Sequence, residues 1–181
     1  MPESPGFELR QINGRSIVRL RVRPSGAEAA GNALQLPLEA LQWRDADPAA
    51  CWLGPDQWLL CSDSKPAREI LGHIDSTLSD QLYAATDMSS QYVCFSLSGP
   101  AARTVLAMGC GIDLHESAFT TGHCTRTLFA NVLLFMVVVE DDSFDLYVDR
   151  SYARYLSDWF VNSGEDPITG ELKIAEHSEQ I

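Results

Sequence analysis

QWLLCSDSKPAREIL (57–71) and SFDLYVDRSYARYL (143–156) follow one pattern of apolar and polar positions. Each stretch begins with a short apolar run typical of a strand and continues into apolar residues at helical spacing. The matching positions are Trp58 and Phe144, Leu60 and Leu146, Ala67-Arg68 and Ala153-Arg154, and Ile70 and Leu156. A sequence that matches itself in order and spacing predicts two similar halves.

The segments upstream of both stretches extend the match. SIVRLRV (16–22) alternates like a strand and runs into the Ala-rich PSGAEAAGNAL, and QYVCFSL (91–97) runs into SGPAARTVLAMG. In the second helix Ser98 is the predicted N-cap, and Gly109 and Gly111 are the predicted stops. Each half therefore has the order strand, helix, two hairpin strands and helix.

This organisation predicts an α+β domain of duplicated β-α-β-β-α halves, with mixed or antiparallel sheets and helices packed on them. We expect one domain over 10–163, made of pseudo-repeats at about 10–85 and 86–163. Residues 1–9 form an N-terminal tail and 164–181 a polar C-terminal tail without periodicity. The aromatic residues of RSYARYLSDWFVNSG lie at helical spacing, which predicts a core-facing stripe.

Composition limits the function. The chain of 181 residues is 45% apolar and carries a formal net charge of −12, which excludes nucleic acid as a partner because phosphate needs neutralising cations. We expect no membrane partner, since the longest apolar run, 132–139, is too short to span a bilayer. Five cysteines without metal or disulfide spacing favour a reduced, cytoplasmic location.

The basic residues are concentrated near the start of the chain. Five arginines fall within fourteen positions: Arg10, Arg15, Arg19, Arg21 and Arg23. They form either the solvated face of an early strand or a contact with an acidic partner, and the sequence leaves both interpretations open.

No set of residues predicts catalysis or metal binding. Cys124 with His115 or His123 would be a nucleophile and its base, but a buried thiol is the more common arrangement. Asp113 either forms a turn and caps the preceding helix or binds a ligand. Three acidic residues, Asp141, Asp142 and Asp145, lack the spacing of a calcium loop and are predicted to form a solvated hairpin tip. We therefore expect no catalytic, cofactor-binding or metal-binding residues in this chain.

Four segments carry a family resemblance in their order and spacing. They are WLGPDQWLL (52–60), FSLSGPAARTVLAMGCGIDLHESAF (95–119), GHCTRTLF (122–129) and FDLYVDRSYARYLSDWF (144–160). Together they resemble the gamma subunit of heterotetrameric sarcosine oxidase, over roughly residues 10–163. The gamma-type subunit of N-methylglutamate dehydrogenase is very similar, and one chain does not separate the two.

The resemblance implies a non-catalytic, cytoplasmic subunit of a complex that demethylates sarcosine to glycine, forming hydrogen peroxide and 5,10-methylenetetrahydrofolate. It implies larger alpha and beta subunits and a small delta subunit as partners. FAD, FMN, NAD and tetrahydrofolate are expected in those partners, and none in this chain. The layout more distantly resembles the folate-binding domain of aminomethyltransferases. However, Leu128-Phe129-Ala130-Asn131 stands where that family has its Gly-Tyr-Thr-Gly-Glu run.

Two site predictions follow. For a subunit, aromatic and arginine residues are candidate interface anchors, namely Arg19, Arg21, Trp43, Trp52 and Trp58. For a stand-alone folate-binding or aminomethyltransferase-like protein, Asp87 or Asp113 would hold the pterin.

Overall fold

The computed structural model describes residues 6–163 and 172–174. Its elements, in chain order, are β1 (Phe7–Ile12), β2 (Ser16–Val22), η1 (Pro24–Gly26), α1 (Ala27–Leu34), β3 (Trp43–Arg44), β4 (Ala49–Gly54), β5 (Gln57–Ser62), α2 (Ala67–Thr77), β6 (Tyr83–Asp87), β7 (Tyr92–Ser98), α3 (Ala102–Gly109), β8 (Cys124–Phe129), β9 (Val132–Glu140), β10 (Ser143–Asp149), η2 (Arg150–Tyr152), α4 (Ala153–Ser163) and β11 (Leu172–Ile174). No helix in these ranges is long and apolar enough to cross a membrane.

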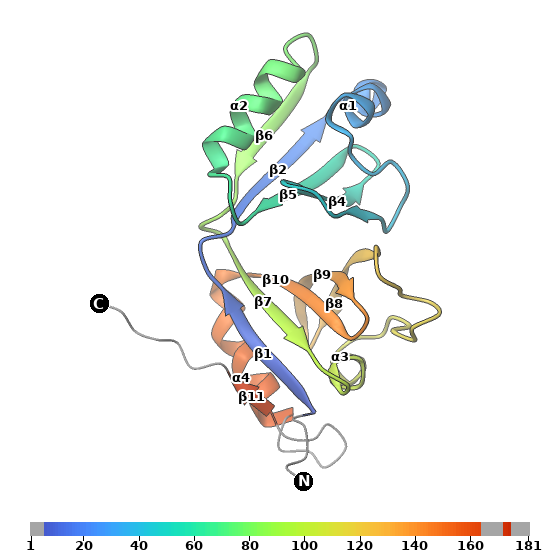
Figure 1. The fold of residues 1–181 in the computed structure, drawn as a ribbon, viewed down its shortest axis with the longest axis vertical. Helices are drawn as coiled ribbons and strands as arrows, with labels where there is room; N and C mark the ends of the chain where they lie inside the picture. Colours follow the sequence, from blue (N-terminus) through green and yellow to red (C-terminus); the bar gives the residue numbers. More distant parts are fainter. Residues whose placement is uncertain (1–5, 164–171, 175–181) are drawn as a thin grey trace, which may run out of the picture.

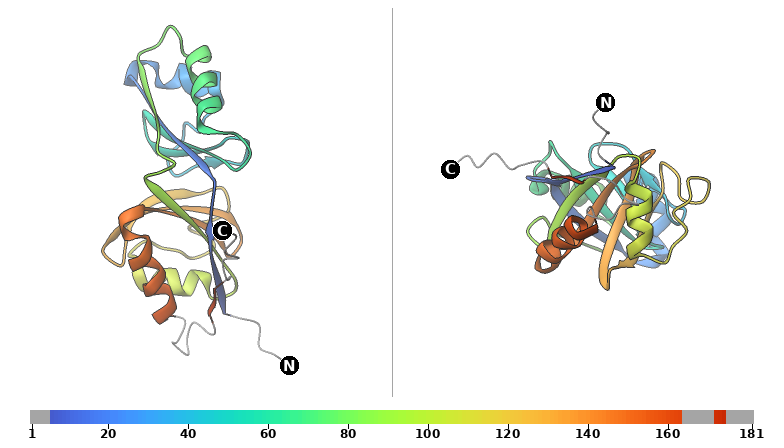
Figure 2. Two further views of the ribbon diagram at one scale, coloured as in Figure 1. Left: turned by 90° about the vertical axis from the view of Figure 1, so that its left-hand side faces the viewer. Right: turned by 90° about the horizontal axis from the view of Figure 1, so that it is seen from below.

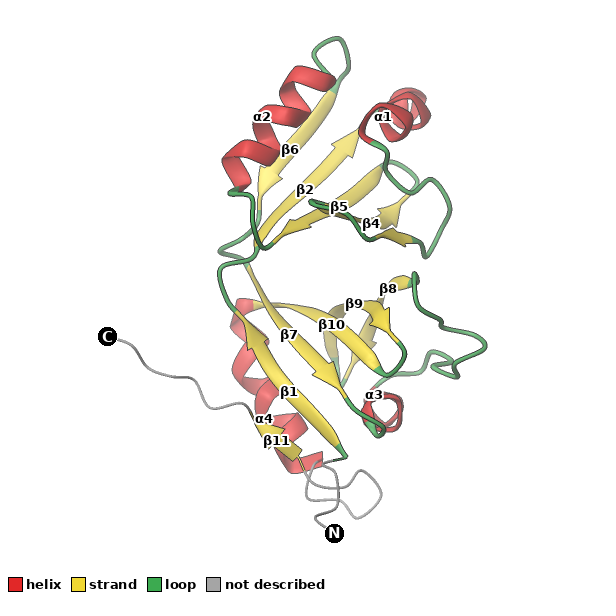
Figure 3. Ribbon diagram, viewed as in Figure 1, coloured by secondary structure: helices red, strands yellow, loops and turns green. Residues whose placement is uncertain are grey.

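The strands form two sheets, one in each of two lobes (Figure 1). The upper sheet has the order β3-β4-β5-β2-β6, and the lower sheet has the order β8-β9-β10-β7-β1-β11. The strand pairs are antiparallel except β1 with β11, which is parallel. Helices α1 and α2 belong to the upper lobe and α3 and α4 to the lower lobe (Figure 3). The predicted α+β class, with duplicated halves, is confirmed.

The two sheets exchange one strand each. β1 precedes β2 in the sequence but pairs with β7 in the lower sheet, and β6 precedes β7 but pairs with β2 in the upper sheet. The chain therefore crosses between the lobes twice, once between β1 and β2 and once between β6 and β7. Figure 2 shows both crossings side by side at one side of the molecule.

Strand alternation divides the apolar residues among three cores. In β2, Val18, Leu20 and Val22 face the helices of the upper lobe, whereas Ile17 faces the other way. The lower lobe buries a larger core against α3 and α4 that includes Phe129 and Phe160, whose rings stack with centroids 5.3 Å apart. A third core joins the opposing faces of the two sheets, so the lobes pack through apolar side chains.

One local prediction is wrong, and another holds only in part. Ser98 is the last residue of β7 and caps no helix, and α3 begins at Ala102 after a turn through Gly99. Gly99 has φ +117°, and a Cβ there would lie 3.0 Å from the Gly6 carbonyl oxygen, so the turn requires glycine. The predicted aromatic stripe over η2 and α4 is only partly core, because Phe160 is buried while Tyr152 and Tyr155 are about half exposed.

The predicted C-terminal tail contains one short strand. β11 pairs with β1 in the register Phe7 to Leu172, Glu8 to Lys173 and Leu9 to Ile174. The remaining residues of the tail, 164–171 and 175–181, and the N-terminal residues 1–5 lie outside the described part of the chain.

Candidate functional site

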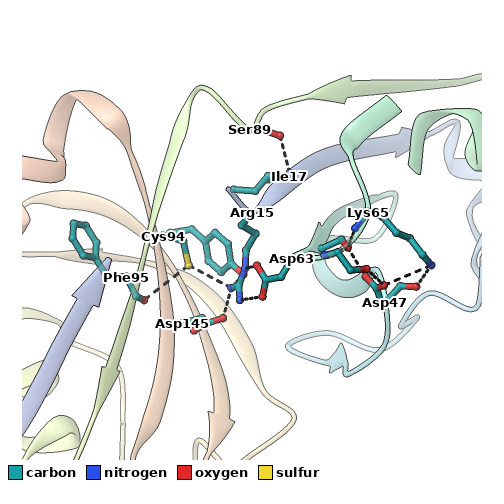
Figure 4. A network of polar contacts seen from close by, with 12 residues as sticks. Arg15, Ile17, Asp47, Asp63, Lys65, Ser89, Cys94, Phe95 and Asp145 are labelled. Atoms are coloured by element: carbon teal, nitrogen blue, oxygen red, sulfur yellow. Dashed lines mark hydrogen bonds and ion pairs between the residues drawn. The ribbon is translucent and has the colours of Figure 1, made fainter. Parts of the chain in front are cut away.

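Among the described residues, the side chain with the most polar contacts lies where the chain first crosses between the lobes. Arg15 stands between β1 and β2, and its guanidinium donates to both carboxylate oxygens of Asp63 in the upper lobe, at 2.7 and 2.8 Å. From the lower lobe it contacts the Asp145 carboxylate and the Tyr147 hydroxyl, the latter at 2.8 Å. Figure 4 shows the guanidinium between the two acidic side chains, so one arginine ties both sheets together.

Burial makes this network stronger than a surface ion pair. The side chains of Arg15 and Asp145 are 14% and 15% exposed, whereas Asp63 is 61% exposed. Desolvation lowers the pKa of Arg15, but the hydrogen bond to Asp63 and the nearby Tyr147 and Asp145 more than offset it, so the pKa is raised above its ordinary value. The same hydrogen bond lowers the pKa of Asp63. The arginine is permanently charged, and its hydrogen bond favours the ionised form of Asp63.

A cavity of about 270 Å³ opens beside this network, between the two lobes. Its walls combine Arg15 with four carboxylates and two thiols: Asp45, Asp47, Asp63, Asp145, Cys51 and Cys61. Most of these groups already have partners. Asp47 accepts from the hydroxyls of Ser62 and Ser64, and these bonds lower its pKa. The cavity therefore lies between the lobes, and most of its charged side chains already bond to other groups of the same chain.

A larger cavity of about 360 Å³ lies inside the upper lobe, under α1 and α2. Its walls combine apolar side chains with the charged or titratable Arg44, Lys65, His73, Asp47 and Glu69. Arg44 donates to the Gln35 side chain at 2.8 Å, and Lys65 contacts the Asp47 backbone carbonyl. No cysteine, serine or threonine lines this cavity, so it offers no hydroxyl or thiol nucleophile.

The proposed nucleophile and its bases do not form a catalytic pair. Cys124 is completely buried between the sheets, and its thiol contacts the carbonyl oxygens of Gln42 and Trp52 at 3.2 and 3.6 Å. The Nδ1 of His123 accepts from the backbone N–H of Thr120 at 3.3 Å. His115 contacts the Ser117 hydroxyl through its Nδ1 at 2.8 Å.

Most of the cysteines line the inter-sheet core. Cys51, Cys61, Cys94 and Cys124 are buried there, and contacts with Cys124 and Cys61 raise the pKa of the Cys51 thiol. Burial raises the pKa of Cys94. Raised thiol pKa values mean protonated, unreactive sulfur at neutral pH. No group of three or more His, Cys, Asp or Glu side chains in residues 6–163 and 172–174 has the geometry of a metal site.

The two carboxylates considered for a pterin each form a turn with their own backbone. Asp87 accepts from the N–H and hydroxyl of Ser89, and Asp113 accepts from the N–H of His115 at 2.9 Å. Of the two interpretations of Asp113, these contacts match the turn-forming one.

The predicted interface residues occupy three different environments. Trp43 and Trp52 pack partly buried against the inter-sheet core, and the Trp43 indole donates to the Val138 carbonyl at 2.9 Å. Trp58 is 0% exposed and donates to the Pro37 carbonyl, which leaves it no surface to offer to a partner. Arg19 and Arg21 share the open face of β2 and contact Gln57 and Asp56, respectively. The structure does not bring the tryptophans and arginines into one patch.

Two of the three acidic residues predicted for the solvated hairpin tip lie there, and the third does not. Asp142 has the left-handed φ of a turn residue and, like Asp141, lies at the tip. Asp145 lies inside β10 and pairs with Arg15. Its partner is 130 positions away in the sequence, and the alternation SFDLYVD, with polar residues on the face opposite Phe144 and Leu146, is the only local signal for it.

Comparisons with known proteins point in one direction. Residues 22–166 match the model of the sarcosine oxidase, gamma subunit family. Sarcosine oxidase subunit gamma of Corynebacterium sp. strain P-1 is 26% identical over 162 residues, covering 86% of this chain and 79% of the relative. The corresponding protein of Arthrobacter sp. is 25% identical, covering 86% of this chain and 78% of the relative.

Two solved structures share the fold. A chain of heterotetrameric sarcosine oxidase from Corynebacterium sp. U-96 superposes with a TM-score of 0.79 and 26% identity, over 87% of this chain and 83% of that chain. Glycine cleavage system aminomethyltransferase T from Bartonella henselae gives a TM-score of 0.68 at 14% identity, over 93% of this chain and 47% of that chain. The second likeness concerns the fold alone.

Proposed function

The chain belongs to the sarcosine oxidase gamma subunit family, and from this membership we propose that it is the gamma subunit of a heterotetrameric sarcosine oxidase. The observation that carries the proposal is the combined match of sequence and structure to one kind of protein. The family match extends over 22–166, and the superposition on a chain of the Corynebacterium oxidase includes 87% of this chain. Both lobes are thus included, rather than one shared motif.

Within the complex, we propose a structural role without catalysis. The side chains that carry most enzyme chemistry are engaged in the fold here: Cys124 is buried, and His123 and Asp113 bond to nearby backbone N–H groups. The polar network around Arg15 is likewise complete within the chain and joins the two lobes. These contacts hold the fold of the chain itself together, and the proposed role in assembly rests on the family match.

The chemistry then belongs to the partner subunits. We propose larger alpha and beta subunits and a small delta subunit as partners, with FAD, FMN, NAD and tetrahydrofolate bound there, in the cytoplasm. Sarcosine is the proposed substrate of the complex because the relatives carry that name.

Co-expression of this chain with the other subunits tests the proposal. We expect it to co-elute with the flavin-containing subunits in size-exclusion chromatography, and we expect the complex to turn over sarcosine. Omission of this chain should lower the yield of assembled oxidase. A chain that runs alone while the other subunits assemble and turn over sarcosine normally would contradict the proposal. Turnover of N-methylglutamate instead of sarcosine would assign the chain to the related dehydrogenase.

A further inference from the structure

The cavity of about 360 Å³ in the upper lobe lies between two helices of that lobe, α1 and α2. Leu34 lines it from α1, Ile74 lines it from α2, and Ala50 lines it from β4 of the sheet below. Its volume lies within the range of small-molecule pockets, about 300–1,000 Å³. Three exposed side chains at its rim show where it opens to solvent, namely Gln35, Glu69 and His73.

The lower lobe fills the equivalent position with an aromatic ring. α1 and α3 each have eight residues, and α2 and α4 each have eleven, so Leu34 corresponds to Gly109 and Ile74 to Phe160. The Phe129 ring lies between the latter two. It stacks on Phe160 with ring centroids 5.3 Å apart, and a Cβ on Gly109 would lie 2.4 Å from it. The cavity of the upper lobe is therefore found where the lower lobe holds a phenyl ring.

Two differences between the repeats leave this position without a side chain in the upper lobe. The edge strand β8 has six residues and ends at Phe129, whereas the edge strand β3 of the upper sheet has only two. On the sheet, Ala50 pairs with Leu60 where the lower sheet pairs Met136 with Leu146. A short strand and a small residue thus replace the groups that fill the lower lobe.

One cation of this cavity has no counterion in the described part of the chain. Arg44 pairs with Ala50 across β3 and β4, so both side chains stand on the same face of the sheet. Its Nη1 donates to the neutral Gln35 side chain at 2.8 Å, while its Nε is buried and has no hydrogen-bond partner. A buried donor without a partner is costly, and a carboxylate satisfies one side of a guanidinium with two parallel bonds.

The other charged groups of the cavity leave this preference in place. Lys65 contacts the backbone carbonyl of Asp47 and lies 3.9 Å from its carboxylate, which also accepts from the hydroxyls of Ser62 and Ser64. These two residues therefore balance each other. Glu69 is exposed at the rim, where water and salt screen its charge.

We propose that the upper-lobe cavity is a binding site for a small aromatic carboxylate. The ring takes the position that Phe129 has in the lower lobe, between Leu34 and Ile74, and the carboxylate accepts from the Nε side of Arg44. A ring alone would leave Nε unpaired, and an inorganic anion would leave the apolar walls in contact with water, so the ligand carries both parts. This site needs no partner subunit and goes beyond the proposed structural role.

Calorimetric titration of the full-length chain with phenylacetate and with indole-3-acetate provides the first test. We expect saturable binding with a Kd of about 1 mM or tighter. Phenylacetamide and indole-3-acetamide keep the shape but lack the charge, so they should bind at least about tenfold more weakly. Failure of both acids to saturate the chain would overturn the proposal. Equal affinity for acids and amides would mean that the cavity accepts only a ring, such as a partner's side chain, and would also overturn it.

Substitution provides the second test. Arg44→Met should weaken binding of both acids at least about tenfold. The matched control is Arg68→Met, which changes an exposed arginine of α2 outside the cavity and should leave the affinity unchanged. Ala50→Met introduces the residue that the lower lobe has at this position and should abolish binding of acids and amides alike. Urea unfolding establishes that each variant is folded, and equal affinity of Arg44→Met and Arg68→Met would overturn the proposal even if Ala50→Met does not fold.

Methyl-resolved NMR locates the bound probe. Addition of phenylacetate should shift the methyl signals of Ile70 and Ile74, which line the cavity, and leave those of Leu156, the lower-lobe counterpart of Ile70, in place. Shifts confined to the lower lobe would overturn the proposal. A chain that assembles with its partners but binds neither acid would refute this inference alone and leave the proposed function standing.

Discussion

Replacing Arg15 by methionine tests whether the guanidinium holds the lobes together. Methionine keeps most of the aliphatic length but removes every contact to Asp63, Asp145 and Tyr147. The Asp145 carboxylate, 15% exposed, then loses the cation that balances its charge. The variant thus leaves a nearly buried charge without its partner.

The magnitude follows from the exposure of each pair. The Asp63 side chain is 61% exposed, so its pair contributes at most about 1 kcal/mol. Breaking a fully buried pair costs about 3–5 kcal/mol. Because the Asp145 pair is partly solvated, we expect Arg15→Met to lower the free energy of unfolding by about 2–3 kcal/mol in total. Urea denaturation at pH 7, followed by tryptophan fluorescence, measures it.

A double-mutant cycle with Asp145→Asn refines the test. Once Arg15 is absent, neutralising Asp145 removes the unpaired charge, so the double variant should lose about 1–2 kcal/mol less than the sum of the single losses. Additive losses of unfolding free energy, or a loss below about 0.5 kcal/mol for Arg15→Met, would show that Arg15 does not hold the lobes together.

The same network gives a pH dependence. Arg15 lowers the pKa of Asp63, so the contribution of this carboxylate to stability is complete above its unfolded pKa of about 3.9. It is lost as the pH falls through the lower folded value. Wild-type protein should therefore lose more stability than Arg15→Met on acidification below about pH 4. An equal loss of unfolding free energy in the two proteins on acidification would contradict this account.

Four further predictions concern other parts of the fold. Gly72→Ala should stabilise α2 by about 1 kcal/mol, because a Cβ there meets nothing within 4 Å. Gly109→Ala should lower the free energy of unfolding by about 1–3 kcal/mol, since its Cβ would lie 2.4 Å from the buried Phe129 ring. Urea midpoints that shift in the same direction for Gly72→Ala and Gly109→Ala would contradict these two predictions. Ala130→Gly should stabilise the β8–β9 turn by about 0.5–1 kcal/mol, because Ala130 has a left-handed φ of 46°, and a lower midpoint would show that its side-chain contacts matter more. A thiol reagent should modify only the half-buried Cys110 in the native protein, and a reaction that persists in Cys110→Ser would show that the inter-sheet thiols become exposed.

Local sequence patterns were sufficient to predict many helices and strands, but not to predict which sheet each strand joins. The strands at 16–22 and 57–62 and the helix after Pro66 follow from alternation, turn residues and apolar spacing. Nothing local indicates that β1 lies in the lower sheet, since its pairing with β7 depends on contacts more than 80 residues apart. Strand β5 is buried on both faces, so its sequence lacks the alternation that would show Trp58 to be a core residue rather than an interface residue.

The candidate site was mostly missed for a similar reason. Arg15 drew attention only as one of five clustered arginines, and its partners lie 48 and 130 positions away in the sequence. An acidic residue after a strand, such as Asp63, is common at turns and gives no sign of such a partner.

The strand exchange between the lobes also constrains the order of events during synthesis on the ribosome. Gln11 emerges early, but the residue it pairs with, Phe95, follows 84 positions later. At about 5–20 residues per second, β1 waits roughly 4–17 s for β7. During that interval Phe7 and Leu9, which end with 0% and 3% exposure, have no sheet to join. The nascent chain therefore carries an apolar segment that its second half covers, and during that interval we expect it to be prone to aggregation.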